Sequence, residues 1–85
     1  MIPQSLRPYF WDIDIERFDP RAYPDYTIAR ILEYGDEEAV AWLCQTFSEE
    51  EIKKTLRTER RLSRRSASFW ALVYQVPFAE VAALQ

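Results

Sequence analysis

Apolar side chains recur at intervals of three and four residues along most of the chain beyond residue 23. Residues at this spacing share one face of an α-helix, so each stretch predicts an amphipathic helix whose apolar face is turned toward a core. The apolar positions are Ile28, Ile31 and Leu32, then Val40, Leu43, Cys44 and Phe47, then Ile52 and Leu56, and finally Phe69, Leu72, Val73 and Val76. The pattern therefore predicts four consecutive helices.

Residues that start and stop helices stand between these stretches. Pro24 suits the first turn of the first helix, and Gly35 is expected to end that helix in the left-handed conformation. Asp36 can cap the second helix. Ser48 and Glu51 have the spacing of a capping box, in which each side chain bonds the backbone N–H of the other, at the start of the third helix.

The remaining residues also favour a helical fold. Ser63 or Ser66 can cap the fourth helix, Pro77 ends it, and a final short helix is expected over Pro77–Leu84. The chain has one Gly and no Asn, which disfavours the tight turns of β-hairpins. The sequence predicts an all-α bundle of four to five short helices with an extended N-terminal strap, and residues 1–85 are expected to form one domain.

Three carboxylates alternate with two isoleucines near the N-terminus. In an extended chain Asp12, Asp14 and Glu16 would share one side of the backbone. Carboxylates two residues apart can hold Mg²⁺, but the Gly- or Ser-rich phosphate loop that accompanies such sites does not precede them. We therefore favour a strap in which the isoleucines and the rings of Phe10 and Trp11 pack on the helices and Asp14 caps a single turn.

Composition narrows the classes of function. The chain has 85 residues, 48% of them hydrophobic and 15% aromatic, which allows one thin core rich in rings. It has no His and a single Cys, so zinc and haem sites, His-dependent triads and an internal disulfide are excluded. Cys44 has no neighbouring base and is expected to be a small core residue. We expect no enzyme activity, no cofactor and no bound metal.

Hydropathy does not indicate a membrane protein. No apolar run approaches the roughly 20 residues that a membrane-spanning helix needs. The N-terminal residues also lack the apolar stretch of a signal peptide. We therefore expect a cytoplasmic protein without membrane contacts.

Charge is divided unevenly along the chain. Residues 1–52 carry twelve acidic and four basic side chains, whereas residues 53–85 carry seven basic and two acidic ones. A helix continued through residues 53–65 would gather basic side chains into one stripe, which can pair with the acidic first half of the chain, bind an acidic protein partner, or bind phosphates of nucleic acid. The predicted partner-binding residues are Lys53, Arg57, Arg60, Arg61, Arg64 and Arg65, with Trp70 and Tyr74 nearby.

Trp70 and Tyr74 lie four residues apart, beside the apolar positions of the fourth helix rather than among them. A helix with two apolar faces is either central in its bundle or partly offered to a partner. Aromatic side chains flanked by arginine are typical anchors of protein interfaces. The sequence leaves both interpretations open.

Three segments carry a resemblance to a known family. They are LRPYFWDIDIERFDP, RILEYGDEEAVAWL and LSRRSASFWAL. They resemble small bacterial and archaeal proteins of unknown function with the pattern LRPxFWDxD, LExG and LSxxSxxFWA, which are often encoded beside nucleotidyltransferase-like toxins of the abortive-infection type. The matching positions are Leu6, Arg7, Pro8, Phe10, Trp11, Asp12, Asp14, Glu33, Gly35, Trp42, Leu62, Ser63, Ser66, Phe69, Trp70 and Ala71.

The resemblance implies an antitoxin or accessory role and supplies no catalytic residue. Our first hypothesis is a non-enzymatic protein-interaction module that restrains a partner protein, plausibly a toxin encoded next door. The alternative is a nucleic-acid-binding or regulatory protein that uses the basic residues 53–65. The apolar residues 76–85 offer a surface for a homodimer or for a partner.

Overall fold

The computed structural model describes residues 2–85. Four α-helices follow one another: α1 (Pro24–Tyr34), α2 (Glu37–Thr46), α3 (Glu49–Thr58) and α4 (Arg64–Tyr74). Three short 3-10 helices flank them: η1 (Gln4–Phe10), η2 (Phe78–Glu80) and η3 (Ala82–Leu84). The predicted all-α class is confirmed. In residues 2–85 no helix is both long enough and apolar enough to cross a membrane.

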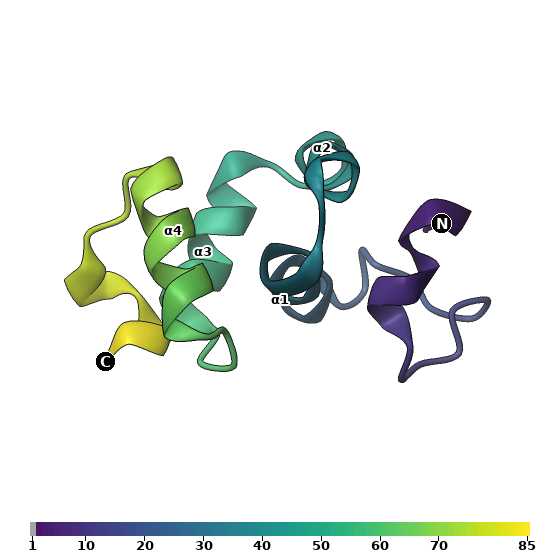
Figure 1. Ribbon diagram of the computed structural model, residues 1–85, viewed down its shortest axis with the longest axis horizontal. Coiled ribbons are helices and arrows are strands. Elements are labelled where there is room, and N and C mark those ends of the chain that lie inside the picture. Colours follow the sequence, from purple (N-terminus) through teal and green to yellow (C-terminus); the bar gives the residue numbers. More distant parts are fainter. Residues whose placement is uncertain (1) are drawn as a thin grey trace.

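Helix α1 lies at the centre of an elongated bundle (Figure 1). It contacts α2, α3, α4 and η1, whereas α3 and α4 also pack against the C-terminal turn η3. The molecule measures 37 × 22 × 21 Å, with η1 at one end of the long axis and the C-terminal turns at the other. The end of α4 and its outer side therefore have few neighbours to cover them.

The core follows the predicted apolar positions of the first three helices. Ile28, Ile31 and Leu32 of α1 are buried, as are Ile52 and Leu56 of α3. Leu43 and Phe47 are also buried, whereas Val40 is only half-buried. The three-to-four spacing thus identified the inner face of these helices correctly.

Three of the predicted helix starts are confirmed. The Asp36 carboxylate accepts the backbone N–H three residues on at the start of α2. Glu51 N–H donates to the Ser48 hydroxyl over 3.1 Å, and Ser48 N–H donates to the Glu51 carboxylate over 2.9 Å, which completes the capping box of α3. Of the two candidates for α4, Ser63 is the cap.

Gly35 ends α1, but not in the left-handed conformation that we predicted. Its φ of −74° and ψ of 156° are extended. A Cβ at this position would lie 2.7 Å from the carbonyl oxygen of Ile31 and 2.9 Å from the Cβ of Ala39. The chain needs glycine here because α1 ends where α2 begins, and no side chain fits between them.

The N-terminal strap is not extended, which corrects the prediction. Residues 4–10 form the 3-10 helix η1, and the chain continues in turns to residue 23. The segment is nevertheless anchored as expected, because Leu6 and Phe10 are buried. Asp14 caps the predicted turn by accepting the N–H of Glu16 over 3.3 Å. Trp11 does not pack inward and remains 63% exposed.

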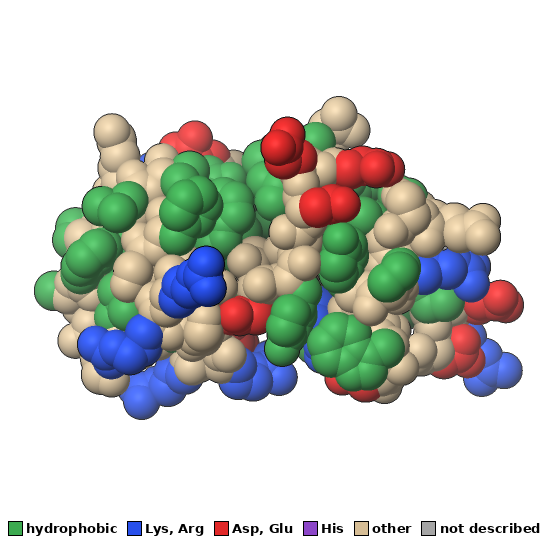
Figure 2. All heavy atoms as spheres, in the orientation of Figure 1, with side chains coloured by type: hydrophobic (Ala, Val, Ile, Leu, Met, Phe, Trp, Pro, Cys, Tyr) green, Lys and Arg blue, Asp and Glu red, His purple; other side chains and the backbone are tan. Residues whose placement is uncertain are grey.

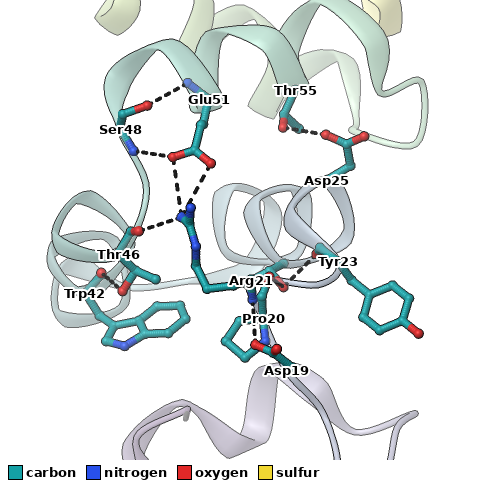
Figure 3. A network of polar contacts seen from close by, with 11 residues as sticks. Asp19, Pro20, Arg21, Tyr23, Asp25, Trp42, Thr46, Ser48, Glu51 and Thr55 are labelled. Carbon is teal, nitrogen blue, oxygen red and sulfur yellow. Dashed lines mark hydrogen bonds and ion pairs between the residues drawn. The ribbon is translucent and has the colours of Figure 1, made fainter.

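Arg21 ties this N-terminal segment to the junction of α2 and α3 (Figure 3). Its guanidinium donates to the carbonyl oxygen of Thr46 over 2.8 Å and to the Glu51 carboxylate over 3.4 Å. It also lies 4.9 Å from the centre of the Phe47 ring. One side chain thereby joins the N-terminal segment to residues that lie 25 to 30 positions further along the chain.

The C-terminal residues form no continuous helix, so the predicted helix over Pro77–Leu84 is wrong. Helix α4 already ends at Tyr74, and Gln75 adopts the left-handed conformation with φ 58°. The turns η2 and η3 follow. They fold back onto α3 and α4 and bury Val76 and Val81.

Candidate functional site

Helix α4 turns toward the core a different face from the one that we predicted. Phe69, Leu72 and Val73, which we placed in the core, are exposed at 56%, 69% and 51%. The inner face consists instead of two buried alanines and two half-buried aromatic side chains. These are Ala67 and Ala71, and Trp70 and Tyr74.

Hydrogen bonds and small side chains explain this orientation. Trp70 donates its ring N–H to the carbonyl oxygen of Leu32 in α1 over 2.9 Å. The Tyr74 hydroxyl lies 3.5 Å from the Cys44 sulfur in α2, and burial raises the pKa of Tyr74. The alanines let α4 approach α3 closely. The amphipathic rings therefore face inward because their polar atoms find partners there.

Cys44 is exposed, although we predicted a core residue. Its sulfur lies beside Tyr74 at the edge of the contact between α2 and α4. Of the four residues with this i, i+3, i+4, i+7 spacing, Val40, Leu43 and Phe47 pack in or against the core, and Cys44 does not. Trp42, which we left outside the set, is half-buried and packs against the core.

The exposed residues of α4 form, with Phe78 of η2, a surface that we call the apolar face: Phe69, Leu72, Val73 and Phe78. Phe78 is 47% exposed. Figure 2 shows hydrophobic side chains gathered over the α4 end of the molecule, with basic side chains along the lower edge and acidic ones over α2. Exposed apolar patches of this kind are typical of interaction surfaces.

The predicted basic stripe does not form, because α3 ends at Thr58 rather than continuing through residue 65. Glu33 of α1 fixes the start of the next helix instead. It accepts the N–H of Ser63 over 2.7 Å and the hydroxyl of Ser66 over 3.1 Å. This long-range contact holds the chain in a non-helical connection that buries Leu62.

Three of the six predicted basic residues pair with acids of the chain itself. Lys53 lies 3.0 Å from the Glu49 carboxylate. Arg57 lies 3.0 Å from Glu80 and so holds η2 against α3. Arg61 lies 2.6 Å from Glu59, and its hydrogen bonds lower the pKa of that carboxyl. Pairing with the acidic first half of the chain, one of the three alternatives, thus holds for Lys53 among these three, whereas Arg57 and Arg61 pair with the two acids of the second half.

The other three, Arg60, Arg64 and Arg65, form no ion pair within residues 2–85. Two of them border the apolar face. Arg64 lines a hollow of about 430 Å³ together with Phe78. Arg65 lines another, of about 440 Å³, together with Phe69. Two of the cations without an ion pair in residues 2–85 therefore lie beside exposed side chains of the apolar face.

The N-terminal carboxylates are not brought together as a metal site would require. Asp12 accepts hydrogen bonds from the Tyr26 hydroxyl over 2.6 Å and from Arg30 over 2.8 Å, and the two bonds lower the pKa of Asp12. Asp14 instead faces Arg17, 3.6 Å away. Within residues 2–85 no three acidic or Cys side chains are grouped to hold a cation.

Arg30 occupies an aromatic sandwich beside Asp12. Its guanidinium carbon lies 4.4 Å from the centre of the Trp11 ring and 4.8 Å from that of Tyr26. One guanidinium nitrogen, Nη1, is buried without a hydrogen bond, and the negative faces of the two rings compensate it electrostatically. Tyr34 packs edge-on against Trp11 at 5.3 Å, which leaves a small exposed aromatic patch whose arginine is already paired.

Together these features define a small all-α bundle with an exposed apolar helix face that is bordered by unpaired arginines. The family model described as a family of unknown function, DUF6922, matches residues 5–56, and the chain belongs to that family. Neither the curated proteins nor the solved structures contain a match. The matched residues run from η1 into α3, so the apolar face of α4 lies outside them.

Proposed function

We propose that the protein is a non-enzymatic interaction module that restrains a partner protein by means of the apolar face. The observation that carries this proposal is the exposure of four large apolar side chains on one helix and the turn that follows it. An isolated surface leucine needs no explanation, but a contiguous group of this size bordered by polar residues is typical of an interface. The resemblance to proteins encoded beside toxins suggests an antitoxin-like role.

The polar side chains support a binding role over catalysis. Ser63 caps α4, and Ser66 donates to Glu33. The Asp12 carboxylate accepts hydrogen bonds from Tyr26 and Arg30. Each of these polar groups is engaged in a contact that holds the fold together.

Nucleic-acid binding is the second candidate. It is favoured by Arg64 beside the exposed ring of Phe78 and Arg65 beside that of Phe69, since single-strand binders combine cations with stacking rings. Two of the four exposed side chains, Leu72 and Val73, are aliphatic, however, and cannot stack on bases. The chain is also acidic overall, with a net charge of −3.

Leu72→Asp is expected to abolish partner binding while leaving the fold intact. The charge would have to be buried in the complex but stays in water in the free protein. We would co-express the chain with the product of the neighbouring gene and measure the affinity of the purified pair. The variant should bind at least about 100-fold more weakly, which corresponds to about 2.7 kcal/mol.

Gln45→Asp is the matched control, because Gln45 is exposed on α2 and the charge change is the same. It should bind like the wild type. Equal affinity of the Leu72→Asp variant and the wild type would contradict the proposed docking face. A wild-type chain that does not bind the neighbour's product would contradict the antitoxin-like role. Binding to mixed single-stranded oligonucleotides at low salt would favour the second candidate.

A further inference from the structure

The distribution of ion pairs singles out one end of the molecule. Seven of the eleven basic side chains lie beside an acid of the same chain. The remaining four all fall within residues 54–65: Lys54, Arg60, Arg64 and Arg65. Lys54 lies within α3, whereas Arg60, Arg64 and Arg65 lie around the connection to α4, where the single carboxylate of Glu33 contacts Ser63 and Ser66.

The start of α4 adds to the positive charge of these arginines. Helices α1, α2 and α3 each carry acidic residues in the first turn, where the helix dipole favours them, whereas α4 carries none. Its first turn instead holds Arg64 and Arg65. This arrangement is unfavourable in the free protein and becomes favourable when an anionic group approaches.

The two arginines lie directly beside side chains of the apolar face. Arg65 precedes Phe69 by one helical turn on the exposed side of α4 and shares a hollow with it. Arg64 shares a second hollow with Phe78 and Leu84. A bound side chain that enters either hollow therefore meets both an apolar surface and a guanidinium group. The carboxylate of Glu33 also lines the hollow of Arg65, where it accepts hydrogen bonds from Ser63 and Ser66. The ligand that satisfies both the apolar surface and the guanidinium group carries apolar and acidic groups next to each other.

We propose that the partner segment is an amphipathic helix whose apolar stripe is flanked by Asp or Glu, and that it lies along α4 with these acids on Arg64 and Arg65. The proposal rests on the proposed function, since it names the chemistry of the partner at the same face. Phe69, Leu72 and Val73 follow the i, i+3, i+4 spacing by which two helices pack.

A second copy of the chain fits this face less well. In a two-fold dimer the same patch lies on both sides of the contact. The arginines of both copies would then lie in one interface. Of the acids near the face, Glu80 is already paired with Arg57, whereas Asp36 and Glu37 lie beside Phe69 on the α2 side of the face. Like charges placed in this way disfavour association. A partner helix with acidic side chains has no such repulsion, because its carboxylates attract the arginines. Its apolar side chains can fill the hollows at the same time.

The test is a displayed library of helices with a fixed leucine stripe and with flanking positions randomised equally among Glu, Lys and Ser. Selection on the wild-type protein should enrich Glu over Lys at least about tenfold at positions near Arg64 and Arg65. Selection on the Arg65→Glu variant should lose or reverse this preference. Lys54→Glu changes the charge equally on the outer side of α3 and should select the same helices as the wild type.

The outcomes separate the two proposals. Helices that bind in a Leu72-dependent way but show no Glu preference would overturn the acidic partner and leave the docking face standing. No enrichment beyond that seen with the Leu72→Asp variant would overturn both proposals. A monomer–dimer equilibrium of the protein alone that Leu72→Asp abolishes would overturn the inference in favour of a second copy.

Discussion

Trp70→Ala is expected to lower the free energy of unfolding by about 3 kcal/mol, because it removes a large ring from the contact between α4 and α1 and leaves the carbonyl oxygen of Leu32 without its donor. Leu72→Ala, two positions away, should change it by less than about 0.5 kcal/mol, because that side chain is exposed. The spacing of apolar residues alone predicts the opposite order.

Urea denaturation followed by far-UV circular dichroism measures both variants. The expected loss is a large part of the total, since a chain of this length has a stability of roughly 4–13 kcal/mol. Trp70→Phe keeps most of the packing and should cost about 1 kcal/mol for the lost hydrogen bond. If Leu72→Ala proves more destabilising than Trp70→Ala, α4 is oriented as the sequence pattern predicts and the apolar face does not exist.

Phe10→Ala is expected to destabilise the protein by about 3–4 kcal/mol, the usual cost of removing a buried ring. Phe10 lies within 6.1 Å of Tyr26 and 5.8 Å of Phe18, measured between ring centres, and is only 2% exposed. It joins η1 to α1. Its loss should detach the N-terminal segment as well as open a cavity.

Trp11→Ala provides the comparison at the neighbouring residue. Trp11 is mostly exposed and contacts Arg30 and the edge of the Tyr34 ring, so its removal should cost no more than about 1 kcal/mol. Hydrogen exchange of the backbone amides in η1 should accelerate in the Phe10→Ala variant and change little in the Trp11→Ala variant. Equal effects of the two substitutions would mean that η1 does not dock by means of the Phe10 ring.

Local signals sufficed to predict the helices and most of their starts. Asp36 and Ser48 cap their helices by bonds to residues three positions away, and such bonds can be read directly from spacing. The inner face of α1 could be predicted for the same reason. Its set of Ile28, Ile31 and Leu32 has no competing apolar set on the other side of the helix.

Helix α4 offers two sets of residues with identical spacing, and only tertiary contacts decide between them. Phe69, Leu72, Val73 and Val76 are spaced i, i+3, i+4 and i+7, and so are Ala67, Trp70, Ala71 and Tyr74. We assigned the core to the first set because it repeats the apolar spacing of the preceding helices. The second set faces the core because its alanines allow a close approach of the helices and its rings find hydrogen-bond partners in α1 and α2. The regular spacing of Ala67, Trp70, Ala71 and Tyr74 was the signal in the sequence that could have identified the inner face of α4.

The end of α3 could not be predicted from its neighbours in sequence. Neither Gly nor Pro stands between Thr58 and Ser63, so local propensity allows the helix to continue. The break depends on Glu33, thirty residues away from Ser63, which binds the start of α4. Such a contact is visible only in three dimensions. Because α3 ends at Thr58, the predicted basic stripe does not form. The basic residues divide instead into a group that is paired with acids and a group that is not.

The orientation of α4 is the central claim, and the chemical accessibility of single thiols tests it most directly. In a Cys44→Ser background, the thiol introduced by Leu72→Cys should react with a water-soluble reagent about as fast as in urea. The thiol introduced by Ala71→Cys should react at least about 100-fold more slowly, because reaction there requires local unfolding. A protected thiol at position 72 together with a reactive one at position 71, in monomeric protein, would contradict the account.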